Sequence, residues 1–191
     1  LFDTLNFQTS ATATYLFFQQ GQGTGKTATD TNLTANGQLP SGNNFLIQRL
    51  GFHLIPNVQD ATPEIAVDVV RDFYCVMENS LIEIVVRGRE FDFQAPGSLF
   101  LPNIAISQKS DGLAATPSYV GRVGDYNAKN WIALNTPIAL EALASFNLKM
   151  AVNTSNVQVA AALGRLAATG AGVTLPAALR WQLGGTLERS K

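Results

Sequence analysis

The sequence has few charged residues, one cysteine and one histidine. Only 14% of its 191 residues are Asp, Glu, Lys or Arg, whereas a typical soluble domain carries about 25%. The single cysteine, Cys75, cannot form a disulfide within the chain. Together with the single His53 it leaves no ordinary zinc site. The shortage of histidines also disfavours a metal-dependent cupin, so we expect neither a metal nor another cofactor.

The charges that are present show no basic patch. Lys and Arg number 13 and Asp and Glu number 14, and the cations are scattered singly except for Arg87 and Arg89. A nucleic-acid-binding domain would show a basic stripe, so no sequence-specific nucleic-acid partner is expected. No apolar run reaches the roughly 18 residues that span a bilayer. The first residues also lack the pattern of a signal peptide. A surface this poor in charge indicates either that the chain buries surface against partners or that its polar surface is uncharged. The many Asn, Gln, Thr and Ser residues support the second explanation, and assembly would account for both.

Short apolar runs separated by Gly, Pro, Asn and Thr predict an all-β sandwich or barrel. In the clearest run, 145–152, apolar residues strictly alternate with polar or small ones. A second run, 179–187, is interrupted at Gly184-Gly185, as at a β-bulge. Apolar residues on both faces of 45–55 predict a strand buried on both sides. The remaining predicted strands are 12–20, 81–87, 90–94, 99–101, 104–108, 118–123 and 131–134.

One amphipathic helix is predicted over 62–78. Thr62 can cap it, Pro63 suits its first position, and Asn79 is a plausible end. Apolar residues at helical spacing form one face. Carboxylates recur every four residues on the other face, which is interpreted as solvated, with a divalent cation or a basic partner as the alternative. These carboxylates are Asp60, Glu64, Asp68 and Asp72. The segment 156–168 stays open between helix and strand.

The segment Gly21 to Thr27 looks like a phosphate-binding loop but departs from its pattern. The motif G-x-x-x-x-G-K-[ST] requires glycine at position 20, which is Gln20. The following residues also make a poor helix start, whereas such a loop opens a helix. The segment is therefore interpreted as a flexible loop between strands. His53 is interpreted as a core or edge histidine and Cys75 as structural, because no catalytic signature accompanies either. No catalytic, cofactor-binding or metal-binding residue is predicted.

The order of the segments supports a family resemblance. The segments in question are Gly37-Gln38-Leu39-Pro40, the strand 45–55, the helix, the run 81–87, Phe91 to Phe93, the Pro-containing 95–102 and the closing strand 179–187. In this arrangement the chain resembles jelly-roll capsid proteins of tailless icosahedral viruses, particularly phage-like ones. The resemblance implies a two-sheet, eight-stranded sandwich. It further implies localisation in a virion, where many copies pack into a shell with other virion proteins and with an internal membrane as a candidate partner.

The sequence thus predicts one jelly-roll domain over 1–191 that is a structural, self-assembling subunit and not an enzyme. Polar residues 1–11 are predicted to form an arm that reaches a neighbour. The main alternative is a carbohydrate-binding module, whose candidate aromatic residues are Trp131, Trp181, Tyr119 and Tyr126. A glycan-cleaving enzyme on the same fold would need two carboxylates in a cleft. The candidates for that pair are Glu83, Glu90, Asp92, Asp111 and Asp125.

Overall fold

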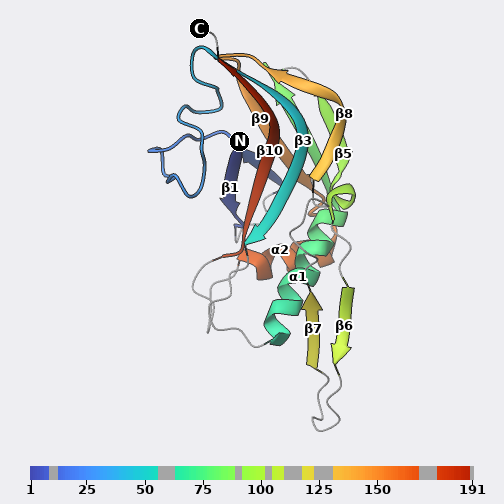
Figure 1. Ribbon diagram of the computed structural model, residues 1–191. Coiled ribbons are helices and arrows are strands. Elements are labelled where there is room, and N and C mark those ends of the chain that lie inside the picture. Colours follow the sequence, from blue (N-terminus) through green and yellow to red (C-terminus); the bar gives the residue numbers. More distant parts are fainter. Residues whose placement is uncertain are drawn as a thin grey trace.

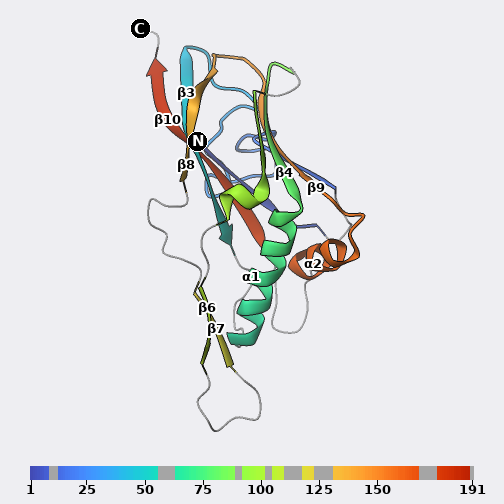
Figure 2. The same cartoon turned by 90° about the vertical axis from the view of Figure 1, so that its right-hand side faces the viewer.

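The chain folds into two antiparallel four-stranded sheets that pack face to face (Figures 1 and 2). A computed structural model describes residues 1–8, 13–55, 63–88, 92–101, 105–109, 118–122, 131–167 and 176–189. The first sheet has the order β1 (Phe2–Asn6), β10 (Ala178–Arg189), β3 (Asn43–Ile55), β8 (Trp131–Leu140). The second has the order β2 (Thr14–Phe17), β9 (Phe146–Val152), β4 (Ser80–Val86), β5 (Phe93–Pro96).

The pairing of these eight strands defines a single jelly roll. The first strand pairs with the last, β1 with β10, and the next pairs inward are β2 with β9, β3 with β8, and β4 with β5. This is one long antiparallel hairpin rolled up into two sheets, which is the double-sheet jelly-roll arrangement. The predicted fold class is confirmed.

Additional elements are inserted between the sandwich strands. Helix α1 (Pro63–Glu78) follows β3, helix α2 (Val157–Ala167) follows β9, and the short 3-10 helix η1 (Gly97–Phe100) follows β5. A separate hairpin, β6 (Ala105–Lys109) and β7 (Ser118–Arg122), lies beside α1 and extends with it beyond the sandwich (Figures 1 and 2).

The core lies between the sheets because period-two alternation puts apolar side chains on their inner faces. In β9, residues 146, 148, 150 and 152 are buried, as the sequence predicts. Trp181 is fully buried at the centre, where its ring meets those of Phe100, Phe52 and Phe17 at centroid distances of 5.0, 5.6 and 6.4 Å. The bulge predicted in 179–187 is also present. The register of β10 on β3 shifts between Gly184 and Gly185, and a Cβ on Gly185 would overlap the carbonyl oxygen of Leu46.

The helix predicted over 62–78 is confirmed as α1. Its end is fixed by Asn79, whose backbone N–H bonds to the Val76 carbonyl and whose side-chain amide bonds to the Cys75 carbonyl. The ambiguous segment 156–168 forms the second helix, α2, so the expectation of one helix is corrected to two among the described residues. Asn156 caps α2 by accepting a bond from the N–H of Gln158 at 3.0 Å.

Three further expectations need correction. Residues 99–101 were expected in a strand, but 97–100 form η1, where Gly97 packs closely on Ser80 and Met77. Strand β3 is not buried along both faces, because Asn44, Gln48 and Arg49 are exposed. Within the segment 1–11, residues 2–6 form β1 and pair with β10 inside the same chain, so this part is a strand and not a free arm.

Candidate functional site

The sandwich has two long flanks, which differ in whether a described loop covers the edge strand of the first sheet. The closed flank consists of β1, β2 and the loop 18–42. The open flank consists of β5, β8 and the turn that leads from β4 to β5. At the closed flank the carboxylate of Asp3, which has no exposed surface, accepts bonds from Lys26 Nζ at 2.6 and 2.7 Å. It also accepts the backbone N–H of Phe18 at 2.6 Å. One buried carboxylate therefore joins β1, the end of β2 and the loop.

The outer edge of β1 is covered by the same loop. Phe2 donates its N–H to the side chain of Asn32 at 2.8 Å, and its carbonyl accepts bonds from the hydroxyl of Thr31 and the N–H of Asn32. Arg180 extends the attachment, because its guanidinium bonds to Thr4 Oγ1 and to the Thr29 carbonyl. These bonds occupy backbone groups that an edge strand otherwise offers to another chain.

This arrangement explains the segment that looks like a phosphate-binding loop. The ammonium of Lys26 is paired with Asp3, and the Lys26 side chain is only 8% exposed. The loop opens no described helix, and it is fastened to β1, so the expectation of a flexible loop is corrected. The sequence carried one usable signal for this pair: Asp3 falls on the same face of its strand as Leu1 and Leu5, which pack against the core.

The acidic face predicted for the helix is not simply solvated. Asp72 is 2% exposed, and its two carboxylate oxygens accept bonds from Arg165 of α2 at 2.6 and 2.7 Å. The bidentate pair joins α1 to α2, and burial of Asp72 is tolerated because the guanidinium compensates its charge. Asp60 and the side chains of Glu64 and Asp68 lie outside what the structure describes.

The carboxylates considered for glycan cleavage are not brought together where they are described. Glu83 lies on the outer face of its sheet, where it accepts bonds from Lys149 and Gln94, each at 2.8 Å. The hydrogen bond from Lys149 lowers the pKa of Glu83 against the opposing effect of burial, and the bond from Gln94 adds to it. Asp92 instead lines the open flank. Glu90, Asp111 and Asp125 lie outside the described residues.

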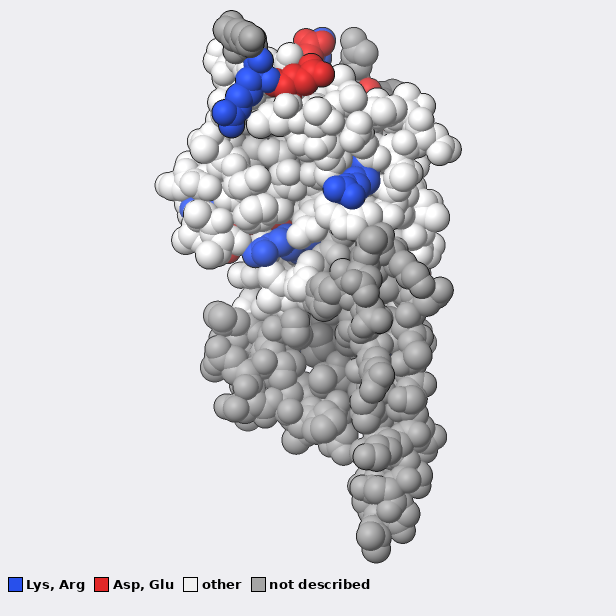
Figure 3. All heavy atoms as spheres, in the orientation of Figure 1, with Lys and Arg blue, Asp and Glu red and all other residues white. Residues whose placement is uncertain are grey.

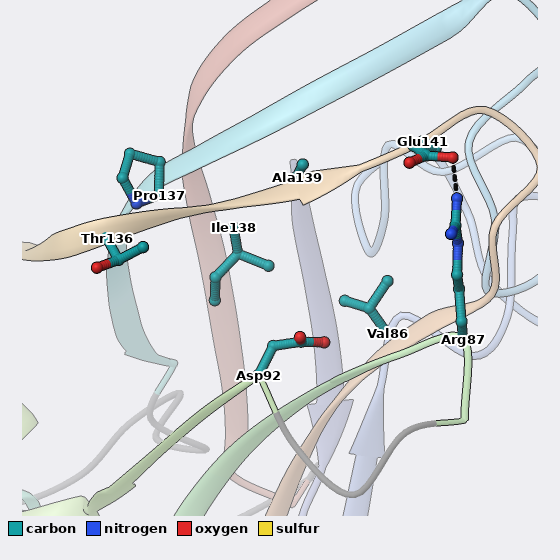
Figure 4. Close-up of a pocket in the computed structure, with 8 residues that line it drawn as sticks. All are labelled: Val86, Arg87, Asp92, Thr136, Pro137, Ile138, Ala139 and Glu141. Carbon is teal, nitrogen blue, oxygen red and sulfur yellow. Dashed lines mark hydrogen bonds and ion pairs between the residues drawn. The ribbon is translucent and has the colours of Figure 1, made fainter.

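The open flank contains a cavity of about 300 Å³ (Figure 4). Its apolar side is formed by side chains that include Val86 and Ile138, and at its rim Arg87 forms an ion pair with Glu141. Asp92, the residue before β5, points toward the cavity from the side of the second sheet (Figure 4). The full lining is Val86, Arg87, Asp92, Thr136, Pro137, Ile138, Ala139 and Glu141. The cavity therefore combines an apolar floor with two carboxylates and one guanidinium.

The outer face of the first sheet carries little charge (Figure 3). Two cations on it lie over aromatic rings, with Arg49 4.9 Å from the centroid of Trp131 and Arg180 5.1 Å from that of Phe2. Of the aromatic residues considered for sugar binding, Trp181 is in the core. Trp131 has its ring covered by Arg49, and the side chains of Tyr119 and Tyr126 lie outside the description. The two tryptophans, whose side chains are described, therefore do not form an exposed aromatic platform together.

His53 and Cys75 are both half-buried. His53 lies opposite Arg180 in the pairing of β3 with β10, and its pKa is lowered chiefly because burial disfavours the cation and also by the charge of Arg180. Cys75 packs against the core and not on a polar face. Within the described ranges, no three His, Cys, Asp or Glu side chains are grouped as metal ligands. No described helix has the length and apolar character to cross a membrane.

Comparison with protein-family models, curated proteins and solved structures finds no match. The class of the protein is therefore defined by its own strand pairing: it is a single jelly-roll β-sandwich with one closed and one open flank.

Proposed function

We propose that this chain is a structural coat subunit that assembles with copies of itself into an icosahedral viral shell. Its place would be the virion, with other virion proteins as neighbours and an internal membrane as a candidate contact. Jelly rolls serve as capsid and lectin domains. The covered ring of Trp131 gives the lectin-like reading no support, so the structural role is the stronger candidate.

The observation that carries the proposal is the edge strand β8. It forms one side of its sheet, runs for ten residues and contains no charged residue. Long uncharged edges invite pairing with another chain, and proteins that stay monomeric protect them with charges, prolines or bulges, or cover them. In β8, Pro137 and the irregular stretch 134–137 protect only the middle of the edge. The closed flank is covered in this way, and the open flank is not covered by any described segment.

Further exposed apolar side chains lie at the end of the sandwich that carries the cavity. The exposed fractions of Leu143 and Leu187 are 60% and 45%; Leu143 follows β8, and Leu187 lies on β10 opposite Phe45, which pairs with Leu140 of β8. Symmetric shells repeat each contact many times, so a contact that is weak in one pair is sufficient when it recurs. This explains how a subunit of low charge can assemble without one very large interface.

The test is the particle mass of the purified chain, measured by light scattering over a dilution series and a salt series, with electron microscopy of any large fraction. We expect discrete assemblies that grow with concentration. A 20.4 kDa species under all conditions would reject self-assembly as an intrinsic property of the chain. A glycan-binding screen of that monomer would then test the lectin-like alternative.

A further inference from the structure

The cavity of the open flank lies beside the short edge strand of the second sheet. Strand β5 pairs with β4 only as far as Phe93 opposite Ile84, whereas β8 of the first sheet continues to Leu140. Beyond Phe93, no described strand pairs with Val86 on the side of β5, although β9 pairs with it on the other side. The cavity occupies the space between the sheets at this end, where Val86 and Ile138 form its apolar floor.

The rim of the cavity is shaped by the residue that follows β4. Arg87 has φ +57°, in the left-handed region that only glycine adopts readily. Its backbone N–H donates to the Ser145 carbonyl at 2.7 Å. With the backbone held in this way, the guanidinium lies at the rim and forms an ion pair with Glu141 (Figure 4). These two charges therefore neutralise each other.

Asp92 supplies the charge that remains. Its backbone N–H donates to the Ile84 carbonyl at 2.9 Å, which fixes the residue beside β4, and its carboxylate points toward the cavity (Figure 4). Among the described residues, this carboxylate has no hydrogen-bond or ion-pair partner. The lining holds two carboxylates against one guanidinium, so the cavity has an excess of one negative charge.

The lining indicates the chemical class of a ligand. An apolar floor favours an alkyl group, and an unpaired carboxylate favours a cation that donates hydrogen bonds. None of the eight lining residues is aromatic, so the lining forms no aromatic cage for a quaternary ammonium. The volume of about 300 Å³ is at the small end of ligand pockets. These features suit a short alkyl chain that ends in a protonated primary amine.

We propose that this cavity binds an alkylammonium group, with the alkyl chain on Val86 and Ile138 and the ammonium on Asp92. Two sources have this chemistry: a free small amine and a lysine side chain of another copy of the chain. Lys26 and Lys149 are not such lysines, because each forms an ion pair within its own chain. The proposal goes beyond the shell function and does not depend on it, because the whole site lies within one chain.

The test uses n-butylamine as the probe and saturation-transfer difference NMR as the readout, which serves for a monomer and for a large assembly. Wild-type protein should transfer saturation to the alkyl protons with a saturable titration curve. Asp92→Asn keeps the shape of the side chain but removes its charge. It should raise the dissociation constant at least about tenfold, because hydrogen bonds to charged groups are the stronger ones. n-Butanol, which has the same length and no charge, should bind wild type at least about tenfold more weakly than the amine does.

A matched control is Glu188→Gln, which removes the charge of an exposed carboxylate on β10 that does not line the cavity. It should leave the dissociation constant unchanged, and circular dichroism of both variants should show the wild-type spectrum. The proposal is overturned if wild type transfers no saturation to the amine. It is equally overturned if Asp92→Asn binds the amine as wild type does, or if n-butanol binds as well as the amine.

Light scattering at constant ionic strength distinguishes the two sources. A lysine of another copy is the source if n-butylamine and Asp92→Asn each lower the particle mass while n-butanol does not. A free amine is the source if Asp92→Asn loses amine binding and keeps the wild-type particle mass. A chain that stays monomeric but binds the amine through Asp92 rejects self-assembly and leaves this site standing.

Discussion

The two flanks of the sandwich differ in how their charged residues are placed and in whether a loop covers the edge strand. The closed flank buries a charged pair, Asp3 with Lys26, and uses a long loop to cover the edge of β1. The open flank keeps its ion pair, Arg87 with Glu141, at the surface beside a cavity, and no segment that the structure describes covers the edge of β8. We expect the closed flank, whose polar groups bond within the chain, to contribute more to the stability of the fold than the open flank does. Four experiments test this contrast, in order of decreasing expected effect.

The largest expected effect is at Asp3. Asp3→Ala leaves Lys26 buried without its partner and the N–H of Phe18 without its acceptor, so the free energy of unfolding should fall by about 3–5 kcal/mol. Urea denaturation measures this change in the free energy of unfolding. The double variant Asp3→Leu with Lys26→Met removes both charges and should recover most of the loss. A single variant as stable as wild type would show that the ion pair does not hold the flank closed.

The next effect compares two glycines with left-handed backbone. Gly37, in the closed-flank loop, has φ +61° and Gly88, in the open-flank turn, has φ +68°. Alanine at either position should cost about 1–2 kcal/mol. We expect Gly37→Ala to have the larger effect, because its carbonyl and the N–H of Phe146 bond at 2.8 Å and limit relaxation. Thermal unfolding of both variants checks the order, and the reverse order would count against a more firmly held closed flank.

A smaller effect is expected at the open flank. The side chains of Arg87 and Glu141 are 47% and 61% exposed, so Arg87→Ala or Glu141→Ala should change the free energy of unfolding by no more than about 1 kcal/mol. Urea denaturation under the conditions used for Asp3→Ala gives the direct comparison. A loss as large as that of Asp3→Ala would mean that the open flank also stabilises the fold.

The smallest effect is local and depends on pH. The pKa of Asp30 is lowered, first by the backbone N–H of Thr27 and then by its hydroxyl, which bond at 2.9 and 2.7 Å. Its contribution is complete above the unfolded pKa of about 3.9 and is lost as the pH falls through the lower folded value. The protection of the Thr27 amide against exchange, relative to its intrinsic rate at each pH, should therefore fall below about pH 4. Asp30→Asn should remove that pH dependence, and an unchanged profile in the variant would assign it to another group.

Much of the fold could be predicted from local patterns. The alternation in 145–152 and the doubled glycine at 184–185 report on neighbours along one strand, and the structure has both features. The cap and spacing of 62–78 similarly predict α1. Predictions became weaker where local signals compete. Val and Ala in 156–168 allow helix or strand, and contacts of Val159 and Leu163 with the core accompany the helical outcome. Residues 99–101 lack enough length for periodicity to decide.

The limit of prediction from the sequence is clearer at the candidate sites. The sequence by itself determined that the chain is strand-rich, poor in charge and nearly balanced in sign. Only the tertiary structure decided that Lys26 meets Asp3, that Asp72 meets Arg165 across 93 residues, and that the uncharged 131–140 lies at an edge. The physical reason is that period and propensity act between near neighbours. Which carboxylate is neutralised, and which edge stays uncovered, depends on how the rolled hairpin brings distant segments together.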